Sequence, residues 1–135
     1  MADTVTVDLV TPERHFATTD AQLVEVPGGE GDFGVLPGHS PLVSSIRPGL
    51  LKLHKGGNDT ERYLVMGGIA EVNQERCVIL AEYLEDVTAV DLTVADRRLA
   101  DAQKANTQAI GEEDKRAAKR EIAVAEALYT ALAGA

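Results

Sequence analysis

The stretch at residues 26–41, VPGGEGDFGVLPGHSP, has the spacing in this chain that most resembles a ligand-binding motif. Three of its glycines have the G-x-G-x-x-G spacing that binds a dinucleotide pyrophosphate, namely Gly29, Gly31 and Gly34. That motif requires a following helix whose free N–H groups point at the phosphate. Here Pro37 and Pro41 would interrupt the helix, and Glu30 and Asp32 would repel the phosphate. The pattern therefore predicts a glycine-rich connection between two strands and no dinucleotide site.

The three histidines and the single cysteine do not form a pattern typical of catalysis or metal binding. His15, His39 and His54 lack metal-ligand spacing to one another and to Cys77, so no metal site is expected. His39 precedes Ser40, but neighbouring side chains on an extended chain point apart, and no nucleophile-elbow pattern surrounds the pair. A structural or interface role for His39 is favoured, and an enzyme that uses it is kept as an alternative. Cys77 is expected to be a small buried side chain in a strand.

Length and charge limit the class of protein further. The 135 residues suit one domain, or a small domain with an appendage. The net charge of -9 argues against nucleic-acid binding, which requires basic patches. Residues 1–90 contain 14 acidic and 6 basic side chains, whereas residues 91–135 contain 8 and 7, so the two parts present different surfaces.

The sequence also indicates where the protein works. No apolar run approaches the roughly 18 residues needed to cross a bilayer, so direct insertion into a membrane is not expected. The N-terminus resembles neither a signal peptide nor a transit segment. We therefore expect a protein on the cytosolic side, and a bacterial protein rather than one imported into an organelle.

The alternation of apolar and polar residues before residue 90 predicts β-strands. Five runs are expected as strands: residues 4–9, 22–26, 50–54, 62–66 and 77–81. Turn signals separate them, including Pro48-Gly49 and Gly67-Gly68. Many short strands at this spacing predict an antiparallel sandwich or barrel, in which residues 26–41 join two strands.

After residue 90 the apolar period becomes helical. A first helix shows a stripe at alternating spacings of three and four: Leu92, Ala95, Leu99, Ala102, Asn106 and Ala109. Thr93 with Asp96 resembles a capping box at its start, and Gly111 is expected to end it. A second helix should begin near Glu112, with a matching stripe of Ala118, Ile122, Ala125, Tyr129 and Leu132. The short break predicts an antiparallel hairpin, and its alanine-rich stripes predict one that is weakly held and able to move.

Residues 31–42, GDFGVLPGHSPL, closely resemble the signature of the epsilon subunit of bacterial rotary ATP synthases. Three further segments recur in the same order and at the same spacing as in that family: Arg47-Pro-Gly-Leu50, residues 65–72 (VMGGIAEV) and residues 77–81 (CVILA). An alanine-rich helical tail follows, so the resemblance covers essentially the whole chain. Its twelve-residue central motif is specific, because so many glycine, proline, histidine and apolar positions rarely match by chance.

The resemblance implies a fold and a function. The fold is an N-terminal antiparallel β-sandwich of about ten strands in residues 1–90, followed by a two-helix hairpin in residues 91–135. The function is that of a non-catalytic rotor subunit in the central stalk of the proton-translocating ATP synthase. Such a subunit binds the gamma subunit along one side of its sandwich, rests on the polar loops of the c-ring, and couples c-ring rotation to ATP synthesis. The expected location is peripheral, at the cytoplasmic face of the bacterial inner membrane.

The resemblance also assigns residues to the sandwich interface. Glu30 and Asp32, on the acidic glycine-rich loop, are implied to contact the c-ring, where exposed pairs with basic residues would contribute roughly 0 to 1 kcal/mol each. His39 would lie near the junction of gamma and the c-ring. Packing or turn capping inside the sandwich is an equally weighted alternative for His39.

A regulatory function is implied for the hairpin, which in this family can extend along gamma and stop ATP hydrolysis. Lys115, Arg116, Lys119 and Arg120 form a basic cluster that could meet the catalytic beta subunit in that inhibited state, or could be a solvated face with pairs within the helix. The alternative function is therefore a nucleotide-sensing inhibitory module that acts mainly through the hairpin.

Some members bind ATP on the hairpin through a motif I/L-D-x-x-R-A. Here Val94 and Arg98 fit that motif, but Ala95 replaces the aspartate and Leu99 the alanine. Loss of the carboxylate removes a polar partner from such a site. We therefore expect weak or absent ATP binding and no cofactor.

Overall fold

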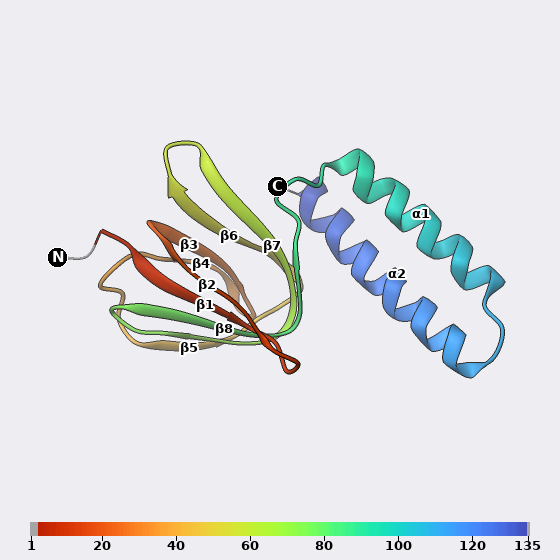
Figure 1. Ribbon diagram of the computed structural model, residues 1–135, viewed down its shortest axis with the longest axis horizontal. Helices are drawn as coiled ribbons and strands as arrows, with labels where there is room; N and C mark the ends of the chain where they lie inside the picture. The colour runs from red at the N-terminus through yellow and green to blue at the C-terminus, as the bar shows by residue number, and fades with distance from the viewer. Residues whose placement is uncertain (1–2, 135) are drawn as a thin grey trace. The chain divides into compact units, whose positions relative to one another are not determined.

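The computed structural model describes residues 3–134, which divide between Thr88 and Ala89 into two compact units (Figure 1). The first unit contains eight strands: β1 (Val5–Val10), β2 (His15–Ala21), β3 (Leu23–Gly28), β4 (Gly31–Val35), β5 (Leu42–Ser45), β6 (Gly49–Gly56), β7 (Asp59–Val72) and β8 (Arg76–Asp86). The second contains two helices, α1 (Leu92–Gln108) and α2 (Glu112–Ala133). The predicted order of a β unit and then a two-helix hairpin is confirmed, with eight strands in place of about ten.

The strands pair in the order β2-β1-β8-β7-β6-β3-β4, and β5 also pairs with β7. Along one edge β7 pairs first with β6, through residues 59–65, and then with β5, through residues 69–72. All pairs are antiparallel except β1 with β8, which is parallel. The predicted antiparallel pairing is thus confirmed for the other pairs, and this parallel pair is the exception. The long chain between β1 and β8 provides the connection that a parallel pair needs.

The core follows from the period-two pattern of the strands. In β1, Val5, Val7 and Leu9 are fully buried, while the residues between them are half-buried. Leu51 and Leu53 of β6 are buried in the same alternating way. Since successive side chains on a strand point to opposite faces, one face of β1 and of β6 forms the core and the other is available to solvent. Cys77 is buried, as predicted.

The glycine pair at residues 67 and 68 lies inside β7 and not at a turn, so that prediction was wrong. Both residues have positive φ, 72° for Gly67 and 107° for Gly68. A Cβ on Gly68 would lie 1.9 Å from the Leu80 carbonyl oxygen of the neighbouring strand. Glycine here lets β7 pass close to β8 and continue from its pairing with β6 to its pairing with β5.

Residues 26–41 are more regular than predicted. Their first part completes β3, Gly29 and Glu30 form a two-residue turn, and β4 follows, so that β3 and β4 make a hairpin. The prediction of a connection between two strands was wrong for residues 31–35. The cause is that β4 contains two glycines in five residues, which hides its period-two pattern. Gly31 and Gly34 lie within β4 and no helix follows this strand, so no helix N-terminus stands there.

The two helices contact each other and run in opposite directions (Figure 1). The N-cap of α1 is Asp91, whose carboxylate accepts a hydrogen bond from the Val94 backbone N–H at 2.9 Å. The predicted capping box at Thr93 was therefore wrong by two residues. α1 ends at Gln108, before Gly111, so the prediction that Gly111 ends it was wrong. Gly111, with φ 86°, is the N-cap of α2, which begins at Glu112 as predicted.

Side-chain burial follows the predicted helical stripes only in part. Ala95 and Ala102 are the buried residues of α1, and Val124, Ala125 and Leu128 are those of α2. The other stripe positions are half-buried or exposed. Neither helix in the described part of the chain is long and apolar enough to cross a membrane.

Candidate functional site

The titratable residues of the described chain lie far apart in small, separate hydrogen-bonded sets. His15 lies 2.7 Å from the Thr18 hydroxyl, and His54 lies 2.6 Å from the Glu25 carboxylate. Burial raises the pKa of the Cys77 thiol to about 12, so this thiol stays protonated. Within residues 3–134 no group of three histidine, cysteine, aspartate or glutamate side chains could hold a metal ion. The surfaces of the two units are therefore the candidate functional regions.

Glu30 and Asp32 lie together at one end of the β3–β4 hairpin, which we call the tip (Gly28–Asp32). The Asp32 carboxylate accepts a hydrogen bond from the Arg47 guanidinium, which also donates to the Gly28 carbonyl oxygen at 2.5 Å. Glu30 is exposed, and among the described residues it has no hydrogen-bond or ion-pair partner. The two predicted carboxylates are thus adjacent, but only the Asp32 charge is compensated.

A groove of about 440 Å³ separates the tip from β5. It is lined by Glu30, Gly31, Asp32 and Phe33 on one side and by residues 42–45 of β5 on the other. Val43 in this groove is 68% exposed, and Leu42 is 38% exposed. The groove therefore combines acidic groups on one wall with apolar side chains on the other.

His39 lies in the segment between β4 and β5. Its Nδ1 atom lies 2.6 Å from the Ser40 carbonyl oxygen, and its backbone N–H donates to Leu36 O at 3.1 Å. The backbone N–H of Gly38 donates to Gln74 O, in the β7–β8 turn, at 2.8 Å. Among the described residues, His39 makes no hydrogen bond or ion pair with Glu30 or Asp32. The structure therefore holds the His39 segment against the β7–β8 turn through the backbone.

An apolar row crosses the outward face of the sheet and was not predicted from the sequence. Val10 of β1 pairs with Leu80 of β8, and Leu80 pairs with Ile69 of β7. The neighbouring positions Leu9, Ile79 and Ala70 are buried in the core, so the row faces outward. Ile69 is 38% exposed. We call Val10, Leu80 and Ile69 the outer apolar row.

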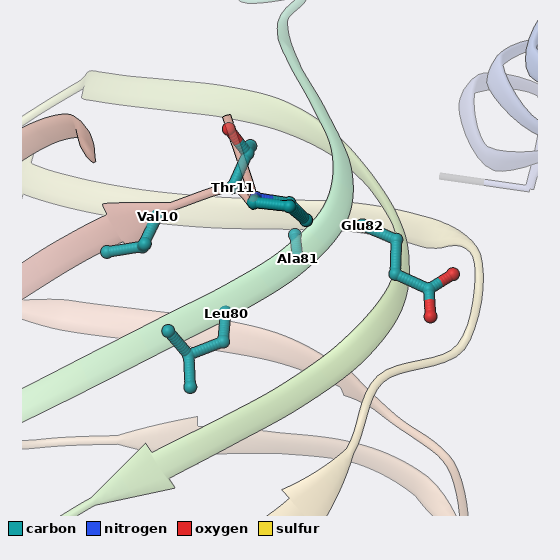
Figure 2. Close-up of a pocket in the computed structure, with 6 residues that line it drawn as sticks. Val10, Thr11, Leu80, Ala81 and Glu82 are labelled. Atoms are coloured by element: carbon teal, nitrogen blue, oxygen red, sulfur yellow. The ribbon is translucent and has the colours of Figure 1, made fainter. Parts of the chain in front are cut away.

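The outer apolar row borders a hollow of about 220 Å³ lined by Val10, Thr11, Pro12, Leu80, Ala81 and Glu82. Figure 2 shows Val10 and Leu80 on neighbouring strands, with the Glu82 carboxylate directed away from both. The sequence does contain a signal for this surface, because β8 has apolar residues at consecutive positions, Cys77-Val-Ile-Leu-Ala81, where a strand with one wet face would alternate.

The residues predicted on the hairpin lie on two different surfaces. Lys115, Arg116, Lys119 and Arg120 are all exposed on the N-terminal half of α2. Val94 is 51% exposed on α1 and lines a hollow of about 370 Å³ together with Arg98 and Glu121. Nε of Arg98 lies 3.4 Å from Oε1 of Glu121. Ala95, at the position of the missing aspartate, is fully buried.

Comparison with known proteins adds to this geometry. A family model described as the ATP synthase delta/epsilon chain β-sandwich domain matches residues 4–87. An ATP synthase epsilon chain of Rhodospirillum rubrum is 39% identical over 134 residues, which cover 99% of this chain and 100% of that protein. That of Maricaulis maris is 41% identical over 133 residues, covering 98% of this chain and 99% of the relative.

Solved structures share the fold. A chain in the Euglena gracilis mitochondrial ATP synthase structure of OSCP, F1 and c-ring aligns with a TM-score of 0.68 at 22% identity, covering 98% of this chain and 83% of that chain. A chain in the Tetrahymena thermophila mitochondrial ATP synthase structure of central stalk and c-ring aligns with a TM-score of 0.58 at 18% identity, covering 93% and 96%. The β unit and the near full-length sequence matches agree with the resemblance drawn from residues 31–42. This chain belongs to the family of ATP synthase epsilon chains.

Proposed function

We propose that this chain, a non-catalytic epsilon-type subunit, joins the gamma subunit to the c-ring and turns with both during proton-driven ATP synthesis. The location that follows is peripheral, at the cytoplasmic face of the bacterial inner membrane. The main support is the outer apolar row, because it exposes aliphatic side chains on a sheet whose other face already forms the core. Apolar surface of this kind on a folded domain is typical of a protein interface.

We assign the outer apolar row and its hollow to gamma. Burial of aliphatic surface contributes about 25 cal/mol for each Å² removed from water, so a few such residues can dominate an interface. Glu71 pairs with Val78 next to the row and is exposed, and Glu82 is exposed at the hollow. A partner segment that fits has aliphatic or aromatic side chains flanked by basic residues.

We assign the tip and His39 to the c-ring side of the same unit. Exposed ion pairs contribute only about 0.2 to 1 kcal/mol, so Glu30 and Asp32 would orient the contact more than they strengthen it. Binding to the rotor would then depend on the apolar row for strength and on the acidic tip for orientation.

The test uses inverted membranes from cells that lack this chain. Adding the purified chain should restore ATP-driven proton pumping, and Ile69→Asp should weaken its binding to gamma at least about tenfold, because a carboxylate would be desolvated at the interface. The matched control is Asn58→Asp, which adds the same charge at an exposed turn between β6 and β7. Unchanged gamma binding by Ile69→Asp would contradict the assignment of the row, and a wild-type chain that restores no pumping would contradict the function.

We further propose a second function, the restraint of ATP hydrolysis by the hairpin in contact with the catalytic beta subunit. It is supported by the division of the chain into two compact units and by the four exposed basic side chains of α2. The alternative of a nucleotide-sensing module has less support, because Glu121 is paired with Arg98 and a second acidic residue, Asp101, lines the same hollow. We propose that the hairpin works without bound ATP or another cofactor.

A further inference from the structure

The tip is held from the side by the end of β5 and by the segment that connects β5 to β6. The Gly29 backbone N–H donates to Ser45 O, and the Arg47 N–H donates to Pro27 O, both at 2.9 Å. Gly28 also forms a bridge with Ile46. A Cβ on Gly29 would lie 2.0 Å from the Ser45 hydroxyl oxygen, so a larger residue here would displace the Ser45 side chain. The backbone of the tip is therefore fixed to its neighbour on the β3 side of the turn.

Arg47 completes this attachment with its side chain. One guanidinium nitrogen donates to the Gly28 carbonyl oxygen, and the other contacts the Asp32 carboxylate. These two acceptors lie on opposite strands of the hairpin, β3 and β4. A planar guanidinium can reach both at once, whereas the single ammonium of a lysine is a point donor. The contact therefore ties the two strands together where the turn begins and ends.

The Arg47 contact also changes the charge that the tip offers to a partner. With Arg47 beside Asp32, Glu30 is the tip carboxylate whose charge stays uncompensated among the described residues. Glu30 lies between Gly29, which the Ser45 contact holds, and Gly31, which has φ 139°. The backbone from which the Glu30 side chain projects is thus held in place, and Arg47 helps to hold it.

We propose that Arg47 is a positioning residue that holds the tip so that Glu30 presents one directed negative charge to a basic side chain of the rotor ring. This inference rests on the proposed function. The proposal predicts the opposite of what the net charge of the tip alone would predict. Removal of the Arg47 charge leaves the tip more negative, which alone would strengthen binding to a basic partner, whereas loss of position weakens binding.

The test measures rebinding of the full chain to inverted membranes that lack it, together with amide hydrogen exchange at Gly29. We expect Arg47→Gln to speed Gly29 exchange at least about tenfold and to weaken rebinding about twofold to fivefold. Glu30→Gln should weaken rebinding by a similar factor in the wild-type chain and cause no further loss when added to Arg47→Gln. Arg47→Lys, which keeps the charge, should still speed Gly29 exchange.

The matched control is Arg76→Gln, which breaks an arginine–aspartate contact on β1 and β8 of the same unit. It should leave both Gly29 exchange and rebinding unchanged, which separates loss of position from general loss of a surface pair. Two results would overturn the inference. The first is rebinding of Arg47→Gln that equals or exceeds that of wild type. The second is a double variant in which the separate losses from Glu30→Gln and Arg47→Gln multiply.

The same experiment separates this inference from the proposed function. If wild type rebinds and Ile69→Asp does not, but the Arg47 and Glu30 variants bind normally, only the inference is wrong. If wild type itself does not rebind, both are wrong.

Discussion

The side chains of Arg98 and Glu121 join the two helices of the hairpin, with 3.4 Å between Nε and Oε1. Arg98 is one of the two residues that fit the family's ATP motif. In this structure its Nε–H donates a hydrogen bond to the Glu121 carboxylate. The aspartate of that motif is replaced by Ala95, which is fully buried. An aspartate at this position would be buried and would lose its hydration. Restoring the motif aspartate would therefore lower the stability of the hairpin.

From this arrangement we expect no micromolar affinity for ATP. Isothermal titration with magnesium-ATP should give no saturable heat at micromolar concentrations, because Glu121 and Asp101 both repel a phosphate near Arg98. The variant Glu121→Gln keeps the shape of the side chain and removes its charge. A gain of binding in that variant would identify Glu121 as the obstacle, while micromolar binding by the wild-type chain would contradict the prediction.

A chain that ends at Val90 tests the proposed restraint by the hairpin. The β unit has a hydrophobic core of its own, so it should still fold and couple without α1 and α2. We expect ATP hydrolysis by membranes to rise at least about twofold while ATP-driven proton pumping persists. Hydrolysis that stays at the wild-type rate would mean that the hairpin is not the restraint in this synthase.

The basic cluster can be tested separately from the rest of the hairpin. Replacement of Lys115, Arg116, Lys119 and Arg120 by glutamine should raise hydrolysis in the same direction as the truncation, because their charges would no longer meet an acidic partner. Lys104→Gln is the control, since Lys104 is also an exposed basic residue but lies on α1. A larger rise with the control than with the cluster would contradict the proposed contact.

Asp91 should stabilise the start of α1, because its carboxylate accepts from the Val94 N–H. We expect Asp91→Ala to lower the stability of the hairpin by about 1 kcal/mol, the usual cost of losing an N-cap. The comparison is Asp96→Ala, an exposed position within the helix where alanine is the better helix former. Urea unfolding followed by circular dichroism should show a loss for the first variant alone. An equal loss for both would mean that the cap contributes little.

The strand pattern could be predicted from the sequence most directly where one face of a strand is polar. Val5, Val7 and Leu9 alternate with polar residues and identify β1 directly. Gly67 and Gly68 are typical of a turn, but a turn and a strongly bent strand can both contain glycines with positive φ, and only the pairing with β8 shows which one is present. Local composition cannot distinguish the two, because the difference depends on residues distant in the chain.

The candidate surfaces show the same limit. The acidic residues at 30 and 32 were identified from composition and family resemblance, but the contact of Asp32 with Arg47 depends on a residue 15 positions away. The outer apolar row consists of residues from three strands. Which side chains come together on the outward face depends on the pairing register of β1, β8 and β7. Likewise the N-cap was misplaced because Thr93 and Asp91 both have suitable side chains, and the backbone geometry decides between them.

Asp8 should make the stability of the β unit depend on acid pH. Its pKa is lowered from 3.8, chiefly by a hydrogen bond from the Thr18 hydroxyl at 2.7 Å and further by the Arg76 guanidinium, against an opposing effect of burial. A lowered folded-state pKa gives stability that is present above pH 3.8 and is lost as the pH falls below it through the folded-state pKa. The stabilising form is the charged carboxylate.

We therefore expect Asp8→Asn to remove part of the fall in unfolding free energy that wild type shows below pH 3.8. Thr18→Val should have the same effect in smaller degree, because it removes the largest cause of the shift and leaves Arg76 in place. Urea unfolding at a series of pH values measures both. An Asp8→Asn curve parallel to that of wild type in this range would show that Asp8 is not the group responsible.

Gly68 should tolerate no side chain, because two independent constraints meet at this residue. Its φ of 107° is rarely adopted by residues with a side chain, and an added Cβ would lie 1.9 Å from the Leu80 carbonyl oxygen, which belongs to the paired strand and cannot move aside alone. We expect Gly68→Ala to cost about 3 kcal/mol or more in the free energy of unfolding.

Gly57→Ala is the matched control for Gly68→Ala. Gly57 also has positive φ, 57°, but nothing lies within 4 Å of the added Cβ, so only the backbone conformation is penalised, at about 1 to 2 kcal/mol. The difference between the two variants measures the close approach of β7 to β8 at the point where β7 changes partner from β6 to β5. Equal costs for the two alanines, measured by urea unfolding, would mean that the strands separate there easily and that the approach at Gly68 is not what holds β5 in the sheet.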